Sequence, residues 1–200
     1  LAGDLSSVQK SFFRNLVAAF FAAIILIKNH TAPKVEKTQW GSLFLRCAFG
    51  TLGILCNFYA IDHLLVADAS ILNKLSPFFA IIFSFLLLKE RIKPAQAMCV
   101  ILAFVGCLFV VKPGFENAHL IPALIGVCGG LGAGIAYTMV RKMGTHGVKG
   151  PVIVFYFSCF SCIIVIPWIV FHYQPMSLRQ LLTLLLAGLF AAGGQRSEER

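Results

Sequence analysis

The stretch ASILNKLSPFFAIIFSFLLL, residues 69–88, is long enough to cross a bilayer and carries polar groups within its apolar length. About 20 apolar residues, each rising 1.5 Å along a helix, span the roughly 30 Å of hydrocarbon in a membrane. The ammonium group of Lys74 is costly there unless water or a partner reaches it. The stretch therefore predicts a membrane helix that handles something polar.

The rest of the chain is similarly apolar. Hydrophobic residues make up 58% of the 200 residues, the mean hydropathy is +0.85, and only 12% of residues are charged. A bilayer offers the backbone no hydrogen-bond partners, and the alternation of a membrane β-barrel is absent, so the spans should be helices. The predicted fold class is all-α, a polytopic helical membrane protein with seven spans: Val8–Ile27, Leu43–Ile61, Ala69–Leu88, Ala95–Val111, Leu120–Val140, Pro151–Phe171 and Leu178–Gly194.

The positive charges fall mainly on one side of these spans. Twelve of the 17 Lys and Arg residues lie in segments 28–46, 89–93 and 141–149 and in the C-terminal tail. Cytoplasmic loops carry an excess of Lys and Arg, so these loops are predicted to face the cytoplasm and the first residues the outside. The net charge of +9 is then a topology signal. The lipid bilayer is the predicted partner, and no nucleic acid is needed.

Cysteine and histidine give little sign of catalysis. All seven Cys fall inside predicted helices, and the five His share no metal-ligand spacing, so no metal or cofactor is predicted. Cys159 and Cys162 do match a C-x-x-C spacing, which can indicate thiol exchange. Because the pair lies near the middle of a span, we favour small-residue packing. A membrane thiol oxidoreductase is the alternative function from another class.

Glycines recur at four-residue intervals within residues 120–140. Gly126, Gly130 and Gly134 form a small-xxx-small ridge, which lets two helix backbones approach closely. The ridge predicts tight packing against a neighbouring helix. Two alternatives are that it lines a cavity, or that it joins two copies in a homodimer, as in a structural or channel subunit.

Polar residues of the 69–88 stretch gather on one face. At 100° per residue, Ser70, Asn73, Lys74, Pro77 and Ser84 occupy one arc of about 100°. Pro77 has no N–H and crowds the carbonyl of residue 73, so it predicts a helix kink. A bent polar face suits a solute pathway. The alternative is that Lys74 merely extends to the membrane interface.

Other polar residues extend this candidate site. Arg14, Asn57 and Tyr137 lie in or at the ends of other predicted spans, although Arg14 could equally be an interfacial anchor. No acidic residue lies in the body of a span, so Lys74 and Arg14 lack an obvious buried counter-charge. This favours a small-molecule ligand with an anionic group, such as a carboxylate or phosphate.

Residues 58–113, with Ser76-Pro77, Lys89-Glu90-Arg91, Gly106 and Lys112-Pro113, resemble the second half of an EamA-type repeat of the drug/metabolite transporter superfamily. Phe13-Arg14 also resembles the start of that repeat's second helix. The resemblance implies ten helices in two inverted five-helix repeats, with the substrate cavity between them. Residues 1–113 would be the first repeat without its first helix, and 114–200 the start of the second, so we expect a fragment.

The predicted function is a transporter that moves a small organic metabolite or drug-like solute across the plasma (inner) membrane by alternating access. The predicted substrate-binding residues are Arg14, Asn57, Asn73, Lys74 and Tyr137, and Pro77 gives the bend. Neither the residues nor the resemblance names the substrate, the direction of transport or a coupling ion, because such folds host varied substrates.

Overall fold

The computed structural model describes residues 6–30, 32–88, 94–111 and 120–172, and positions 175, 177, 180, 182, 183, 185 and 186. Regular structure in these residues is helical, without a strand. Five helices are long and apolar enough to cross a membrane: Val8–Lys28, Lys37–His63, Asp68–Leu88, Leu120–Thr145 and Gly150–His172. The predicted polytopic helical fold is confirmed. The predicted span 178–194 falls largely outside the described residues, and the C-terminal residues 196–200 fall wholly outside them.

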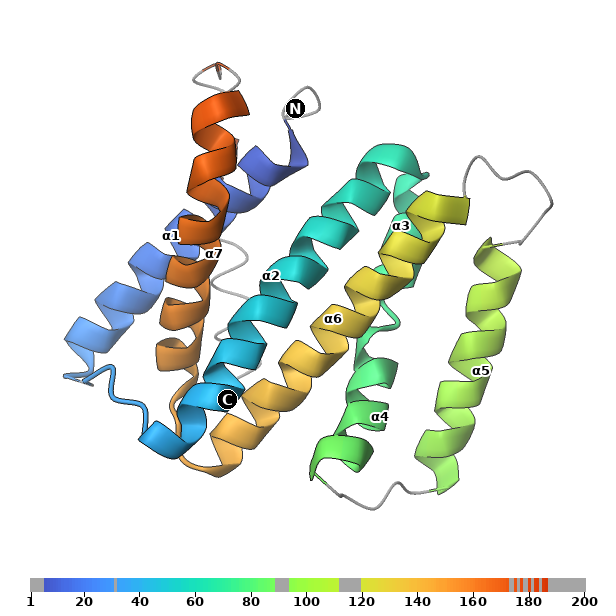
Figure 1. The fold of residues 1–200 in the computed structure, drawn as a ribbon, viewed down its shortest axis with the longest axis horizontal. Helices are drawn as coiled ribbons and strands as arrows, with labels where there is room; N and C mark the ends of the chain where they lie inside the picture. Colours follow the sequence, from blue (N-terminus) through green and yellow to red (C-terminus); the bar gives the residue numbers. More distant parts are fainter. Residues whose placement is uncertain are drawn as a thin grey trace. The chain divides into compact units, whose positions relative to one another are not determined.

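The helices follow the apolar runs of the sequence (Figure 1). In chain order they are α1 (Ser7–Lys28), η1 (Lys37–Gln39), α2 (Trp40–His63), α3 (Val66–Asn73), α4 (Ser76–Leu88), α5 (Pro94–Val111), α6 (Leu120–Thr145) and α7 (Gly150–His172). The chain divides into two compact units, which are described separately. The first comprises residues 1–43 and 143–200, and the second comprises residues 44–142.

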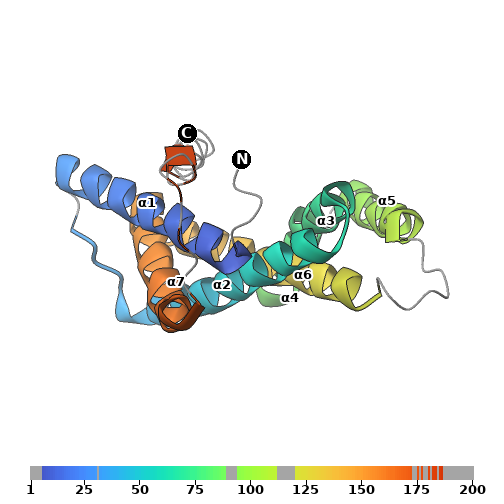
Figure 2. The same ribbon diagram turned by 90° about the horizontal axis from the view of Figure 1, so that it is seen from above.

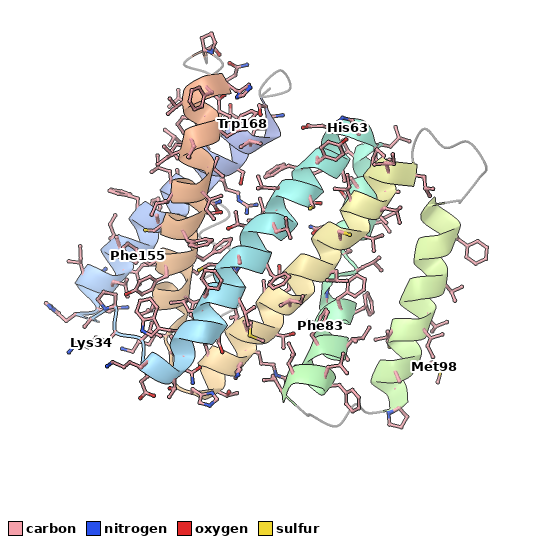
Figure 3. All side chains as sticks on the ribbon, viewed as in Figure 1. Lys34, His63, Phe83, Met98, Phe155 and Trp168 are labelled. Atoms are coloured by element: carbon pink, nitrogen blue, oxygen red, sulfur yellow. The ribbon has the colours of Figure 1, made fainter. Side chains whose placement is uncertain are left out.

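In the first unit, α1 packs against α7 (Figure 2). The segment that follows α1 is attached to the first half of α7, because the Tyr156 hydroxyl donates to the carbonyl oxygen of Pro33 at 2.9 Å. Trp40 packs edge-on against the same Tyr156 ring, with 5.9 Å between centroids. At the far end of α7, Trp168 stacks on His172, and Figure 3 shows Trp168 near that end. Aromatic residues thus mark both ends of α7, as at the two interfaces of a membrane.

In the second unit, α6 lies between α2 and the α3–α4 pair, and α5 packs against that pair (Figure 1). Helices α2 and α6 run antiparallel, since Gly126 faces Ala60 and Gly132 faces Phe49. The α3–α4 pair runs parallel to α6, since Leu72 lies at Gly126 and Phe79 lies at Gly134. These are the directions that alternating membrane crossings require.

The second unit has a buried apolar core, and much other apolar surface faces outward. Leu72, Leu75, Phe79 and Ala123 form one buried cluster among the described residues. Large apolar side chains elsewhere are exposed, including Met98, which is 61% exposed and points away from α5 (Figure 3). An outward apolar surface of this extent indicates a membrane or partner interface, and here the length of the helices indicates the membrane.

Candidate functional site

The predicted span over residues 69–88 lies within one helical segment of membrane length, Asp68–Leu88, and the structure interrupts that segment between α3 and α4 at Lys74 and Leu75. The Leu75 N–H donates to Leu72 at 3.2 Å, three residues back, instead of continuing the α-helical pattern. Pro77 follows within the first turn of α4, where a missing N–H is tolerated. The sequence predicted a kink at Pro77 within one helix. In the structure the helix is interrupted at Lys74 and Leu75, before Pro77.

The glycines of α6 lie directly against this break. A Cβ atom added to Gly126 would lie 2.8 Å from Leu72 Cδ1, and one on Gly130 would lie 2.9 Å from the Leu72 carbonyl oxygen. One on Gly134 would lie 2.5 Å from Phe79 Cβ. Real Cβ atoms essentially never approach so closely, so only glycine allows α3 and α4 to pack here. Because α3 and α4 cover the ridge within the chain, these glycines do not provide the contact between two copies considered above.

A second glycine face of α6 meets α2, and the sequence reasoning missed it. A Cβ on Gly53 would lie 3.0 Å from the backbone nitrogen of Ala133 and 3.0 Å from the carbonyl oxygen of Gly129. One on Gly132 would lie 3.0 Å from the Phe49 carbonyl oxygen. The two backbones are therefore in contact. The signal in the sequence was Gly53 in the middle of an apolar span, where glycine otherwise weakens a helix.

Two adjacent glycines of α6 lie close to three of the predicted site residues. The Cβ position of Gly129 lies 3.1 Å from the backbone nitrogen of Asn57, and that of Gly130 lies 2.9 Å from the carbonyl oxygen of Leu72. Asn73 and Lys74 follow Leu72 directly. Asn57 on α2 and Asn73–Lys74 at the break therefore flank one turn of α6.

The other two predicted residues lie elsewhere. Tyr137 is 54% exposed and lies about two turns further along α6 than Gly130. Arg14 is half-buried in α1, which belongs to the first compact unit, and it already interacts with another group of the chain. Asn57 and the Asn73–Lys74 pair thus lie beside adjacent glycines of α6 in the second unit, and Arg14 belongs to the first unit.

The side chains at this turn have free hydrogen-bonding capacity. We find no hydrogen-bond or ion-pair partner, among the residues that the structure describes, for the side chains of Asn57, Asn73, Lys74 and Tyr137. Both amides are half-buried and the ammonium is exposed. Amides offer donors and acceptors and lysine offers a positive charge, and unpaired polar groups are costly in an apolar environment. The arrangement can therefore bind a polar solute.

The first unit contains buried polar residues that are not among the predicted site residues. The Asn15 amide donates to the Ser11 hydroxyl at 3.5 Å within α1, and Asn15 is only 3% exposed. Gln9, Ser158 and Ser161 are also buried. Polar side chains between membrane helices commonly hold the helices together through hydrogen bonds. Their signal was a short series of small and polar residues on α1 and α7.

The two cysteines of the C-x-x-C pair lie within α7 in the first unit. Cys159 and Cys162 are free thiols in the middle of α7, half-buried and buried respectively. The Cys162 thiol points to the Phe12 carbonyl oxygen of α1 at 3.9 Å, which fits packing between the two helices. Within the described ranges, no group of three or more His, Cys, Asp or Glu residues could hold a metal ion.

A hollow of about 700 Å³ lies in the first unit, and its lining is apolar. Leu16, Val17 and Phe20 of α1 line it together with Phe155 of α7, which Figure 3 labels, and Leu185. A site for a polar solute needs a few directed polar groups in addition to apolar walls. The hollow therefore does not replace the turn at Asn57 and Asn73 as the candidate site.

Comparisons with known proteins agree with a transporter. The EamA-like transporter family model matches residues 1–112. The pseudopaline exporter CntI of Pseudomonas aeruginosa is 32% identical over 198 residues, covering 97% of this chain and 68% of the exporter. Human solute carrier family 35 member G1 is 25% identical over 207 residues, covering 96% of this chain and 56% of the carrier.

A riboflavin transporter of Brucella anthropi is 25% identical over 145 residues, covering 72% of this chain and 50% of the transporter. No solved structure matches the chain. The family match covers more than half of the sequence, and the helices of the structure have the length and apolarity that membrane spans require. The chain is a multi-pass membrane protein that belongs to the EamA-like transporter family of small-solute transporters.

Proposed function

We propose that the protein is a carrier of a small organic metabolite and that it binds the polar part of this solute at the turn flanked by Asn57, Asn73 and Lys74. The observation that carries the proposal is that Asn57 and the Asn73–Lys74 pair, whose side chains have no partner among the described residues, lie beside one glycine-packed turn of α6. Polar side chains in membrane helices usually mark substrate or ion pathways. A purely structural membrane subunit would have no need to leave them unpaired.

Each residue has a distinct role in this proposal. The Lys74 ammonium binds an anionic group of the solute, because no carboxylate of the described chain pairs with it. The amides of Asn57 and Asn73 bind neutral polar atoms, and Tyr137 adds a hydroxyl further along α6.

Transport proceeds by alternating access in the plasma (inner) membrane. Residues 1–113 belong to one repeat and residues 114–200 to an inverted second repeat, and the solute site is exposed to each side of the membrane in turn. Two relatives support a solute carrier, since one is named an exporter of pseudopaline and another a transporter of riboflavin.

The test is transport of a panel of organic anions and zwitterions by the full-length protein in proteoliposomes. The variants are Lys74→Ala and Asn73→Ala, and Lys34→Ala is the matched control, because Lys34 is an exposed lysine in the segment between α1 and α2. We expect saturable flux in the native protein and the control, and a loss of at least about tenfold in both site variants. Absence of saturable flux would overturn the carrier, and flux indifferent to both site variants would overturn the site.

A further inference from the structure

The α3–α4 break leaves backbone carbonyl groups without their helical donors. In a continuous helix, the carbonyl oxygens of Ile71, Asn73 and Lys74 would accept from the N–H groups four residues on. The Leu75 N–H instead donates to Leu72, and the Phe78 N–H donates to Leu75 at 3.0 Å. The residue four beyond Asn73 is Pro77, which has no N–H. All three carbonyl oxygens therefore lose their ordinary donor.

Two side-chain oxygens lie beside these carbonyl groups. Ser76, the first residue of α4, is 94% buried, and we find no hydrogen-bond partner for its hydroxyl among the described residues. Its Cα–Cβ bond tilts toward the start of α4, and so toward the break, as in any α-helix. Asn73, at the end of α3, adds an unpaired amide oxygen. The break thus gathers several oxygen acceptors.

The break is held in place on both sides, which distinguishes a preformed site from a flexible hinge. Leu72 packs on Gly126 and Gly130 before it, and Phe79 packs on Gly134 after it. Carbonyl oxygens held at fixed positions bind a ligand without first having to be ordered.

We propose that the α3–α4 break binds a small cation through the carbonyl oxygens of Ile71, Asn73 and Lys74, the Ser76 hydroxyl and the Asn73 amide oxygen. Unwound backbone at a broken membrane helix presents acceptors of this kind, and neutral oxygens suit both a hard metal ion and an ammonium group. The cation is either an alkali metal ion, such as Na⁺, or the protonated amino group of the solute. The inference rests on the proposed function, because the pathway of the transported solute must reach this break.

We expect the ammonium group of Lys74 to stay outside the proposed cation site. Its side chain is exposed, and its ammonium group lies at the end of a flexible four-carbon stem that can turn away from the carbonyl groups. A solute with both an amino group and an anionic group would be bound at two points, by the acceptors of the break and by Lys74. Its two charges would then balance each other within the apolar bundle.

The test is thermal unfolding of the purified full-length protein, titrated at constant ionic strength with Na⁺ or methylammonium. N-methyl-D-glucamine is the reference cation, and tetramethylammonium, which has no N–H, is the control for the amino group. Ligands that bind the folded state raise the unfolding temperature in a saturable way. The variants are Ser76→Ala and Pro77→Ala, which restores an N–H opposite the Asn73 carbonyl. Ser84→Ala is the control, because Ser84 is equally buried in the same helix.

We expect Na⁺ or methylammonium to stabilise the native protein. The half-saturating concentration should rise about tenfold or more in Ser76→Ala and Pro77→Ala and stay within about twofold in Ser84→Ala. Stabilisation by Na⁺ alone would assign a metal ion, and stabilisation by methylammonium alone would assign an amino group.

No saturable stabilisation in the native protein, or the same half-saturating concentration in all variants, would overturn the cation site. Solute flux that depends on Lys74 would in either case leave the proposed carrier standing, so the two proposals can fail separately.

Discussion

The hydroxyl of Thr138 on α6 donates to the carbonyl oxygen of Ala80 on α4 at 3.2 Å, and it also lies 3.0 Å from the carbonyl oxygen of Gly134 in its own helix. One proton is thus shared between an intrahelical and an interhelical acceptor. Thr138 is only 1% exposed, so no water competes at this position. The contact lies one turn beyond Gly134 and extends the packing of α4 on α6.

Replacing Thr138 by Val removes this hydrogen bond with little change in volume. We expect Thr138→Val to lower the free energy of unfolding by about 1 kcal/mol, the usual size for a bond between membrane helices. Unfolding of the purified protein in detergent measures the change. Thr138→Ser keeps the hydroxyl and should lie closer to the native protein; equal stability of the Val and Ser variants would contradict the role of the bond.

The close contact at Gly134 predicts a position-specific effect of adding one methyl group. A Cβ on Gly134 would lie 2.5 Å from Phe79 Cβ and 3.0 Å from the backbone nitrogen of Ala80, whereas nothing lies within 4 Å of one on Gly144. Gly134→Ala should destabilise the protein by about 1–3 kcal/mol through overpacking. Gly144→Ala, in the same helix, should be neutral or stabilising by up to about 1 kcal/mol. Thermal unfolding compares them, and similar behaviour of the two would refute the contact.

The contact of α2 with α6 predicts the same contrast within α2. Gly53→Ala would force a Cβ against the backbone of Gly129 and Ala133, and Gly41→Ala would meet nothing within 4 Å. Because backbone cannot move aside as a flexible side chain can, we expect Gly53→Ala to reduce folded protein in the membrane and Gly41→Ala to leave it unchanged. Yield of monodisperse protein after extraction, by size-exclusion chromatography, measures this.

Substitutions of Lys74 should separate the effect of its charge from the effect of its shape. Lys74→Arg keeps the positive charge, and Lys74→Met removes it at similar length. If Lys74 binds an anionic group, the KM for solute should rise at least about tenfold in Lys74→Met and distinctly less in Lys74→Arg. Initial rates in proteoliposomes give the KM. An equal rise in both variants would point to a steric role instead.

The cysteine pair of α7 provides a test of the oxidoreductase alternative. Since Cys162 packs toward the carbonyl of Phe12, the double variant Cys159→Ala and Cys162→Ala should keep solute flux within about twofold of native, with at most about 1 kcal/mol lost in stability. Flux and thermal unfolding measure the two effects. Loss of flux without loss of folded protein would show that the thiols take part in function.

Much of the helical layout was predictable because apolar length alone defines a membrane span. The predicted span Pro151–Phe171 became α7, Gly150–His172, and Val8–Ile27 became α1, Ser7–Lys28. The break at Lys74–Leu75 was not predicted, since Pro77 permits either a kink or a new helix start and tertiary packing decides which. Here the packing on the glycines of α6 favours a new helix start.

The candidate site was only partly predictable for a related reason. Helical angles grouped Asn73 with Lys74, because both lie within one segment. They gave no reason to place Asn57 beside them, since that depends on which helix packs against which glycine. The spacing of Gly126, Gly130 and Gly134 indicated a contact face without indicating its partner. Gly53 was overlooked because a single glycine in an apolar span has no periodic signal.

The backbone contact between Gly53 and Gly129 joins two helices that the proposed repeat scheme assigns to different halves of the transporter. A Cβ on Gly53 would lie only 3.0 Å from the facing carbonyl oxygen of Gly129, so no side chain fits between the two backbones. If the two repeats move as proposed, we expect the helices to pivot at this close contact. A disulfide that links the ends of these two helices should then arrest turnover.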